Sequence, residues 1–226
     1  MNNKKAMDIL AMLDSTSSSP AKDSAAEALI KLKQAVAVLE ATQNKELVQY
    51  KRLMAISLNN IACYYKRFVG TNISNRFEKP NVALQYLDSV LAIELSINQQ
   101  SDISTARTHL NICAIESSLG KHKVALTHAQ KALEIARICC KNEANAGKDL
   151  SATLAIAFYN VGTELEHLKN YKEAYEICQV GVDMCGKLLG SQHVLCEKLA
   201  ESLVEIGKNK EVRLGITKRN RRRNDV

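Results

Sequence analysis

The feature that most restricts the fold of this chain is an internal repeat. Its clearest copy, Arg107 to Arg137, reads as two amphipathic helices joined by a tight turn at Leu119–Gly120–Lys121. Weaker copies of the same pattern lie before and after it. A repeat length of roughly 20–50 residues indicates stacked units, each of which buries its apolar face against its neighbours. The sequence therefore predicts an array of helical hairpins.

The copies align on an alanine that opens each second helix, with separations of 42 and then 49 residues: Ala83, Ala125 and Ala174. Each first helix carries an earlier small residue, at Ala62, Cys113 and Gly162. Further small or apolar residues follow each alanine by four and seven positions, which places them on one helical face. We expect the two helices of each hairpin to approach closely at these positions.

This pattern of small, aromatic and alanine positions resembles the tetratricopeptide repeat (TPR) family. The segments SLNNIACYY at 57–65 and LLGSQH at 188–193 are similar to the kinesin-light-chain subtype. The resemblance covers about residues 25–207. It implies an all-α fold, a right-handed α-solenoid of helix-turn-helix repeats, whose members bind other proteins.

Two features depart from the family pattern. The proline that usually closes each repeat is absent, and the repeat spacing exceeds the family norm of about 34 residues. We therefore expect long helices. No heptad coiled coil precedes the repeats, so we do not expect a kinesin light chain.

Composition agrees with an all-α fold outside the membrane. The chain is 46% hydrophobic with two prolines, and it contains no convincing alternating strand pattern. No apolar run approaches the roughly 18 residues of a transmembrane helix. The N-terminal residues lack the apolar core and cleavage site of a secretory signal. We expect a cytoplasmic protein.

We expect three parts along the chain. Residues 1–41 form a degenerate capping repeat, residues 42–207 form three TPR-like repeats plus a C-terminal capping helix, and residues 208–226 form a basic tail. Residues 70–81 are an insertion in repeat one, which is either a functional loop or a tolerated surface loop. Asp149 is expected to cap the first helix of repeat three.

The sequence contains no recognisable catalytic or metal-binding motif. It lacks a phosphate-binding loop, a G-x-S-x-G elbow and an H-E-x-x-H pair, and His122 and His128 fall on different helix faces. Seven cysteines, an odd number without a C-x-x-C pair, are expected to be reduced thiols, most of them on apolar helix faces. We expect no metal, no cofactor and no enzymatic activity.

Asparagines mark one register of the three first helices: Asn60, Asn111 and Asn160 each precede the small residue by two positions. Asparagine in mid-helix costs roughly 0.7 kcal/mol against alanine, so its repetition suggests a use. In TPR proteins that this chain resembles, first helices line a concave groove, and asparagine here bonds to the backbone of an extended peptide. An amide offers both the donor and the acceptor that this requires.

We assign the same groove three further residues: Asn59, Arg107 and Tyr159. Coincidence is one alternative for the asparagine register, because the chain has 17 asparagines, and hydrogen bonds between neighbouring helices are another. The cations with which chaperone-binding members hold a free carboxylate are absent beside this register. The expected partner is therefore an extended or helical segment of another protein.

The C-terminal tail concentrates the positive charge of the chain, whose formal net charge is +7. The residues are Lys218, Arg219, Arg221, Arg222 and Arg223. Since the rest of the chain is nearly neutral, a broad basic face for duplex nucleic acid is not expected. The tail is either a solvated segment, a grip on a polyanion such as RNA or an acidic tubulin tail, or a nuclear address.

The sequence thus favours a non-catalytic scaffold or adaptor that holds a partner segment in a concave groove, within a larger assembly. The kinesin-light-chain resemblance makes a cytoskeletal or ciliary assembly the expected setting. The alternative is a nuclear or nucleic-acid-associated factor that acts through the KRNRRR tail.

Overall fold

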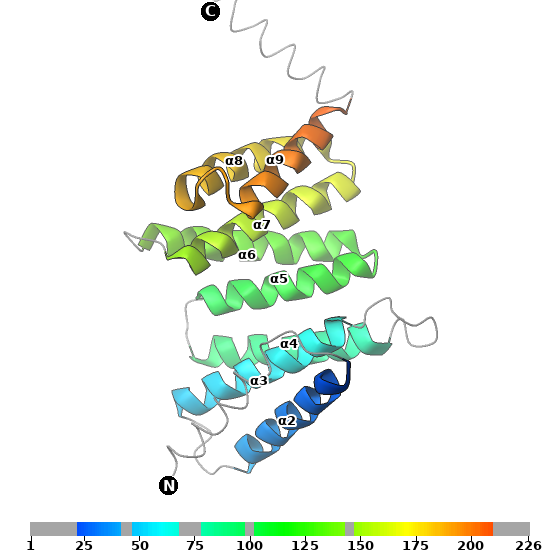
Figure 1. Cartoon of the computed structure of the whole chain (residues 1–226), viewed down its shortest axis with the longest axis vertical. Helices are drawn as coiled ribbons and strands as arrows, with labels where there is room; N and C mark the ends of the chain where they lie inside the picture. Colours follow the sequence, from blue (N-terminus) through cyan, green and yellow to red (C-terminus); the bar gives the residue numbers. More distant parts are fainter. Residues whose placement is uncertain (1–21, 42–46, 68–77, 98–101, 143–146, 210–226) are drawn as a thin grey trace, which may run out of the picture. The chain divides into compact units, whose positions relative to one another are not determined.

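The computed structural model describes residues 22–41, 47–67, 78–97, 102–142 and 147–209. In these residues every regular element is an α-helix (Figure 1), so the expected all-α fold is confirmed. The chain divides into two compact units, Met1–Ser101 and Asp102–Val226. The helices are α2 (Lys22–Glu40), α3 (Val48–Arg67), α4 (Glu78–Ile97), α5 (Ile103–Ser118), α6 (His122–Asn142), α7 (Lys148–His167), α8 (Tyr171–Leu189) and α9 (Val194–Gly207).

The second unit stacks two helical hairpins and a final helix (Figure 1). Helices α5 and α6 form one hairpin, α7 and α8 form the next, and α9 packs on α7 and α8. The first helices also contact one another, α5 with α7 and α7 with α9. Successive hairpins therefore share one continuous core, as a helical solenoid requires.

Small residues let the helices of this unit approach closely. Ala125, Ala129 and Ala132 of α6 are fully buried. A Cβ atom added to Gly162 would lie 2.3 Å from the Sγ atom of Cys178, and one added to Gly181 would lie 2.9 Å from the Cβ atom of Phe158. The small positions of the repeat therefore lie where the sequence predicted them, at the helix interfaces.

Both hairpin turns use a left-handed residue to end the first helix. Gly120 has a φ of +75°, and the Lys121 amide donates to the Glu116 carbonyl at 2.9 Å. Lys169 occupies the equivalent position with a φ of +63°, and the Asn170 amide donates to the Leu165 carbonyl at 2.8 Å. These bonds satisfy the last carbonyls of each helix.

The helix starts differ in part from the sequence expectation. The Asp102 carboxylate caps α5 by accepting from the Ser104 amide at 2.8 Å. The predicted cap at Asp149 is wrong, because α7 already begins at Lys148 and its capping position is Gly147. Asp149 instead lies in the first turn, where a carboxylate favours the positive end of the helix dipole.

The first unit contains α2, α3 and α4, with α2 packed on α3 and α3 paired with α4. Its core joins the three helices through buried side chains: Leu32, Ala35, Leu39, Leu53, Met54, Ala55, Leu58, Ile61 and Val90. Helix α4 begins at Glu78, so the last four residues of the expected 70–81 insertion are helical. Pro80 fits there because the first turn of a helix needs no backbone donor. Residues 70–77 of the insertion, and any helix within residues 5–14, lie outside the described residues.

The expectation that all seven cysteines are reduced thiols is wrong for one pair. Cys185 in the last turn of α8 and Cys196 in the first turn of α9 form a disulfide, with Cα atoms 5.5 Å apart. Helix α9 folds back on α8, which brings the two residues within disulfide reach. Their separation of 11 residues carries no recognisable motif. The other five cysteines are not part of this disulfide: Cys63, Cys113, Cys139, Cys140 and Cys178.

Candidate functional site

The predicted binding residues lie on the first helices of the hairpins. Asn111 is on α5 and Asn160 is on α7, and both side chains are half-buried, whereas the small residues two positions later are buried. Asn60 on α3 of the first unit has the same half-buried status. This difference in burial is expected, because residues two positions apart are rotated by about 200° around a helix and cannot share one buried face. A ladder of the three asparagines stays a prediction.

Arg107 joins α5 to α7 on this face. Its Nε atom donates a hydrogen bond to the Thr153 Oγ1 atom at 3.3 Å, and that hydroxyl donates to the Asp149 carbonyl at 2.8 Å. The Arg107 guanidinium also lies 3.8 Å from the Asp149 carboxylate, in a largely exposed ion pair that adds little stability. Arg107 therefore fixes the spacing of two first helices.

An apolar strip accompanies the asparagine register on α7. Tyr159 is half-buried and packs on the core of the second unit. Ile156, which the sequence reasoning missed, is 36% exposed and lies one turn before Asn160. Residues four apart lie on one face of a helix, so Ile156 and Asn160 give this face one apolar and one amide contact. Asn59 and Asn111 already take part in interactions within the chain.

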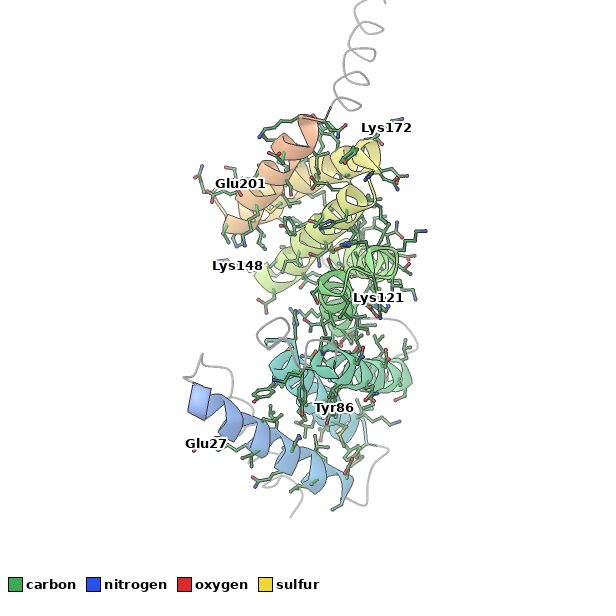
Figure 2. The ribbon with its side chains drawn as sticks, turned by 90° about the vertical axis from the view of Figure 1, so that its right-hand side faces the viewer. Glu27, Tyr86, Lys121, Lys148, Lys172 and Glu201 are labelled. Carbon is green, nitrogen blue, oxygen red and sulfur yellow. A yellow bond between two sulfur atoms is a disulfide. The ribbon has the colours of Figure 1, made fainter. Side chains whose placement is uncertain are left out.

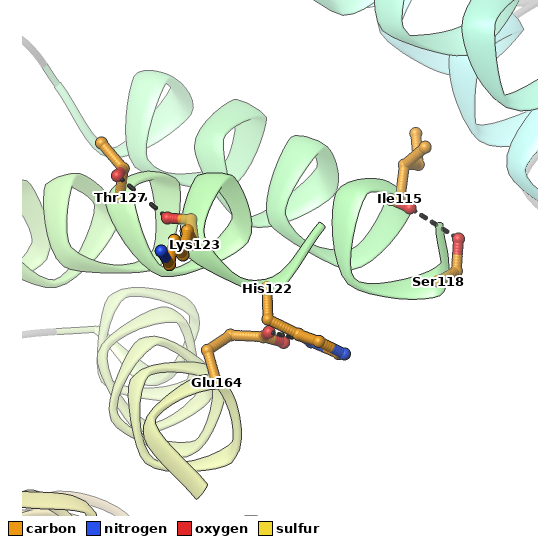
Figure 3. A network of polar contacts seen from close by, with 6 residues as sticks. All are labelled: Ile115, Ser118, His122, Lys123, Thr127 and Glu164. Carbon is orange, nitrogen blue, oxygen red and sulfur yellow. Dashed lines mark hydrogen bonds and ion pairs between the residues drawn. The ribbon is translucent and has the colours of Figure 1, made fainter. Parts of the chain in front are cut away.

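A buried carboxylate links the two hairpins of the second unit (Figure 3). The His122 Nδ1 atom at the start of α6 lies 2.8 Å from the Glu164 Oε2 atom of α7, and the Glu164 side chain is only 3% exposed. The His122 ring also stacks on His167, with ring centroids 4.1 Å apart. These contacts join α6 to the last turns of α7.

A second histidine pair joins α5 to α6. The Nδ1 atoms of His109 and His128 lie 2.9 Å apart, so one ring donates and the other accepts. Burial, together with the nearby charges of His128 and Lys131, lowers the pKa of His109 to about 4. The His109 ring is therefore neutral at pH 7. Among the described residues, no group of three His, Cys, Asp or Glu side chains is arranged to hold a metal ion.

An open groove of about 620 Å³ lies between the second helices of the second unit, over α7. We call it the α6–α8 groove. It contains none of the residues predicted to bind a peptide, which lie on the first helices. Its lining residues are Gln130, Leu133, Glu134, Arg137, Ile138 and Lys141 of α6, Val161 and Leu165 of α7, and Glu173, Glu176, Ile177 and Val180 of α8.

The first unit has a corresponding groove of about 560 Å³ between α2 and α4, over α3. Tyr86 and Ile177 line the two grooves at equivalent positions, because each follows an aligned alanine, Ala83 or Ala174, by three residues. Tyr86 of this groove is labelled in Figure 2. The recurrence indicates that the grooves follow from the repeat geometry. The described helices include none that is long and apolar enough to cross a membrane.

No family model matches this chain, and no curated protein matches it either. Two similar solved structures are crystal structures of nearly identical TPR-like repeats, described as coming from a kinesin light chain of Podosopora anserina. The first has a TM-score of 0.60 at 15% sequence identity and covers 91% of this chain and 85% of that chain. The second, a single-substitution variant, has a TM-score of 0.61 at 15% identity, with coverages of 96% and 91%. The fold is therefore that of TPR-like repeats.

Proposed function

We propose that this protein is a non-catalytic scaffold that holds a segment of a partner protein across its first-helix face. The TPR-like fold supports the coarse assignment, because such arrays typically act as surfaces for protein binding. The observation that carries the finer proposal is the preformed face of α5 and α7. There Arg107 fixes the helix spacing through Thr153, and Asn111 and Asn160 remain half-exposed.

The chemistry of this face suits an extended peptide. Each asparagine amide can donate to a peptide carbonyl and accept from a peptide amide, as one residue of a neighbouring strand would. Ile156 and Tyr159 supply apolar contact for a side chain of the partner. A rigid face loses little conformational entropy on binding, which favours affinity.

The test compares two sets of asparagine variants. Affinity purification with mass spectrometry first identifies partners, and calorimetry then measures the Kd of each purified partner. N60A/N111A/N160A should weaken binding about tenfold or more, because each lost hydrogen bond contributes about 0.5–1.5 kcal/mol. N81A/N170A removes two exposed asparagines and should leave Kd unchanged. A triple variant that binds as tightly as the parent would refute the assignment of the face.

We further propose that the partner belongs to a cytoskeletal or ciliary assembly in the cytoplasm. The support is an analogy, the likeness of the fold to repeats described as those of a kinesin light chain. A fluorescent fusion of the full chain should decorate microtubule-based structures in cells. Nuclear accumulation that disappears when Lys218 to Arg223 are replaced by glutamine would favour the alternative, a nuclear factor acting through its tail.

A further inference from the structure

The α6–α8 groove has a charge pattern that the proposed function does not use. Its floor is apolar, formed by Leu133, Val161, Leu165 and Ile177. Ile138 and Val180 on its rims are 51% and 41% exposed. Such side chains lose contact with water only when something else covers them.

The charged rims of the groove are ordered along its length. Glu173 and Glu176 lie in the first turns of α8, and Glu134 lies opposite on α6. Arg137 and Lys141 follow toward the end of α6. The Arg137 guanidinium lies 5.0 Å from the centre of the Phe158 ring, so its charge is partly engaged there. The end of the groove near the start of α8 is therefore acidic.

A segment of this chain with complementary chemistry begins next to that acidic end. A Cβ atom added to Gly207, the last residue of α9, would lie 3.4 Å from the Tyr175 ring on α8. Tyr175 lies between Glu173 and Glu176 in the sequence. Residues 210–226, which are outside the described residues, carry seven Lys or Arg against two acidic residues, with apolar Val212, Leu214 and Ile216 before the basic run.

The reach of the segment is sufficient. Tyr175 and the groove residues lie on opposite sides of α8, so the chain must pass half-way round that helix. A helix with its side chains is about 10–12 Å wide, so half its circumference is roughly 17 Å. Six extended residues span about 20 Å, which brings Ile216 to the groove and leaves Lys218 to Arg223 to run along it.

We propose that residues 210–226 dock into the α6–α8 groove of the same chain. Ile216 covers part of the apolar floor, and the basic run pairs with Glu134, Glu173 and Glu176. The aliphatic stems of the arginines cover the exposed rims while their guanidinium groups reach the carboxylates. Asp225 comes after the basic run in the sequence, and Arg137 and Lys141 come after the acidic residues along the groove. The order of charges in the segment therefore complements the order of charges in the groove. This contact is independent of the first-helix face.

Limited proteolysis of the full chain tests this contact, because trypsin cleaves after the lysines and arginines of the tail. The parent tail should be cut slowly. E134Q/E173Q/E176Q should raise the rate of cleavage between Lys218 and Arg223 about tenfold, as expected for the loss of several exposed ion pairs. High salt should raise the parent rate similarly, since it screens those pairs.

A matched triple variant, E27Q/E197Q/E201Q, removes three exposed carboxylates that do not line the groove and should leave the rate unchanged. In Figure 2 Glu201 on α9 and Lys172 at the start of α8 project to opposite sides of the second unit. Circular dichroism checks that both variants keep their helical content. Equal cleavage rates in the parent and the groove variant would overturn the proposal, as would an equal effect of the control variant.

Zero-length carbodiimide coupling provides a second measurement that needs no variant. It should join the Lys218 ammonium group to the carboxylate of Glu173 or Glu176 within one chain. Cross-links between two chains, or protection from trypsin that increases with protein concentration, would place the segment on a second copy and overturn the intrachain contact.

Discussion

At the residue scale, two helical glycines of the second unit have opposite roles. A Cβ atom at Gly162 of α7 would meet the buried Cys178 Sγ atom at 2.3 Å, whereas one at Gly186 of α8 would have nothing within 4 Å. Gly162 is thus required by the close approach of α7 and α8. Gly186 only adds backbone freedom to the unfolded chain.

Alanine substitutions at these two glycines should therefore change stability in opposite directions. G162A should lower the free energy of unfolding by about 1–3 kcal/mol, because the added methyl group would overlap the fully buried Cys178 side chain. G186A should raise it by about 0.5–1 kcal/mol, as expected when alanine replaces glycine inside a helix. Urea unfolding followed by circular dichroism measures both. Equal shifts of the two variants would contradict the close approach.

His109 should make the stability depend on pH. Its pKa is about 4 in the folded chain, against about 6.5 when unfolded, so the unfolded chain binds more protons between these values. The stabilisation is therefore complete above pH 6.5 and falls toward pH 4, by up to about 3 kcal/mol. H109Q should flatten this part of the profile. A free-energy difference between parent and variant that is constant from pH 7.5 to 4.5 would disprove the assignment.

The sequence predicted which single residues lie at helix interfaces better than it predicted which residues they contact. Repeat spacing identified Ala62, Cys113 and Gly162 as interface positions, because helical periodicity fixes which residues share a face. It did not reveal that Arg107 binds Thr153, 46 residues away, or that His109 faces His128. Such pairs depend on how two helices cross, and this follows from packing of the whole unit.

At the scale of elements, the disulfide between α8 and α9 should stabilise the final helix. A cross-link that closes a loop of this length is expected to contribute about 2–3 kcal/mol, mainly by restricting the unfolded chain. C185S/C196S, or a reducing agent, should therefore lower the melting temperature of the second unit. C139S/C140A changes two cysteines outside the disulfide and should have a much smaller effect. A melting temperature insensitive to reduction would show that the cross-link has no stabilising role.

Helix existence was predictable at this scale, while helix starts were less so. The repeat pattern predicted an array of helical hairpins, and every described element is a helix. The expected insertion ended at residue 81, whereas α4 begins at Glu78 and has Pro80 in its first turn, where a proline removes no hydrogen bond. Asp149 reads as a cap, yet α7 begins one residue before it.

At the scale of the whole molecule, the two units should lose their structure separately. Their buried clusters share no residue: one centres on Phe158 and Leu154, the other on Ile61 and Val90. F158A should lower the stability of the second unit by about 3–5 kcal/mol, as for other buried aromatic residues. Amide hydrogen exchange in α5–α9 should then accelerate while that in α3 and α4 stays as in the parent. Equal acceleration in both units would show a single cooperative unit.

The α6–α8 groove also has a mechanical consequence for the second unit. On one side of the unit α7 packs directly against both α5 and α9. Close-packed side chains have low compressibility, so this side is stiff. On the other side, α6 and α8 are separated by open space of about 620 Å³. A body with one stiff side and one open side bends most easily by widening or narrowing the open side. The unit should therefore bend by a change in the distance between α6 and α8. A molecule that binds α6 and α8 should change the curvature of the opposite face.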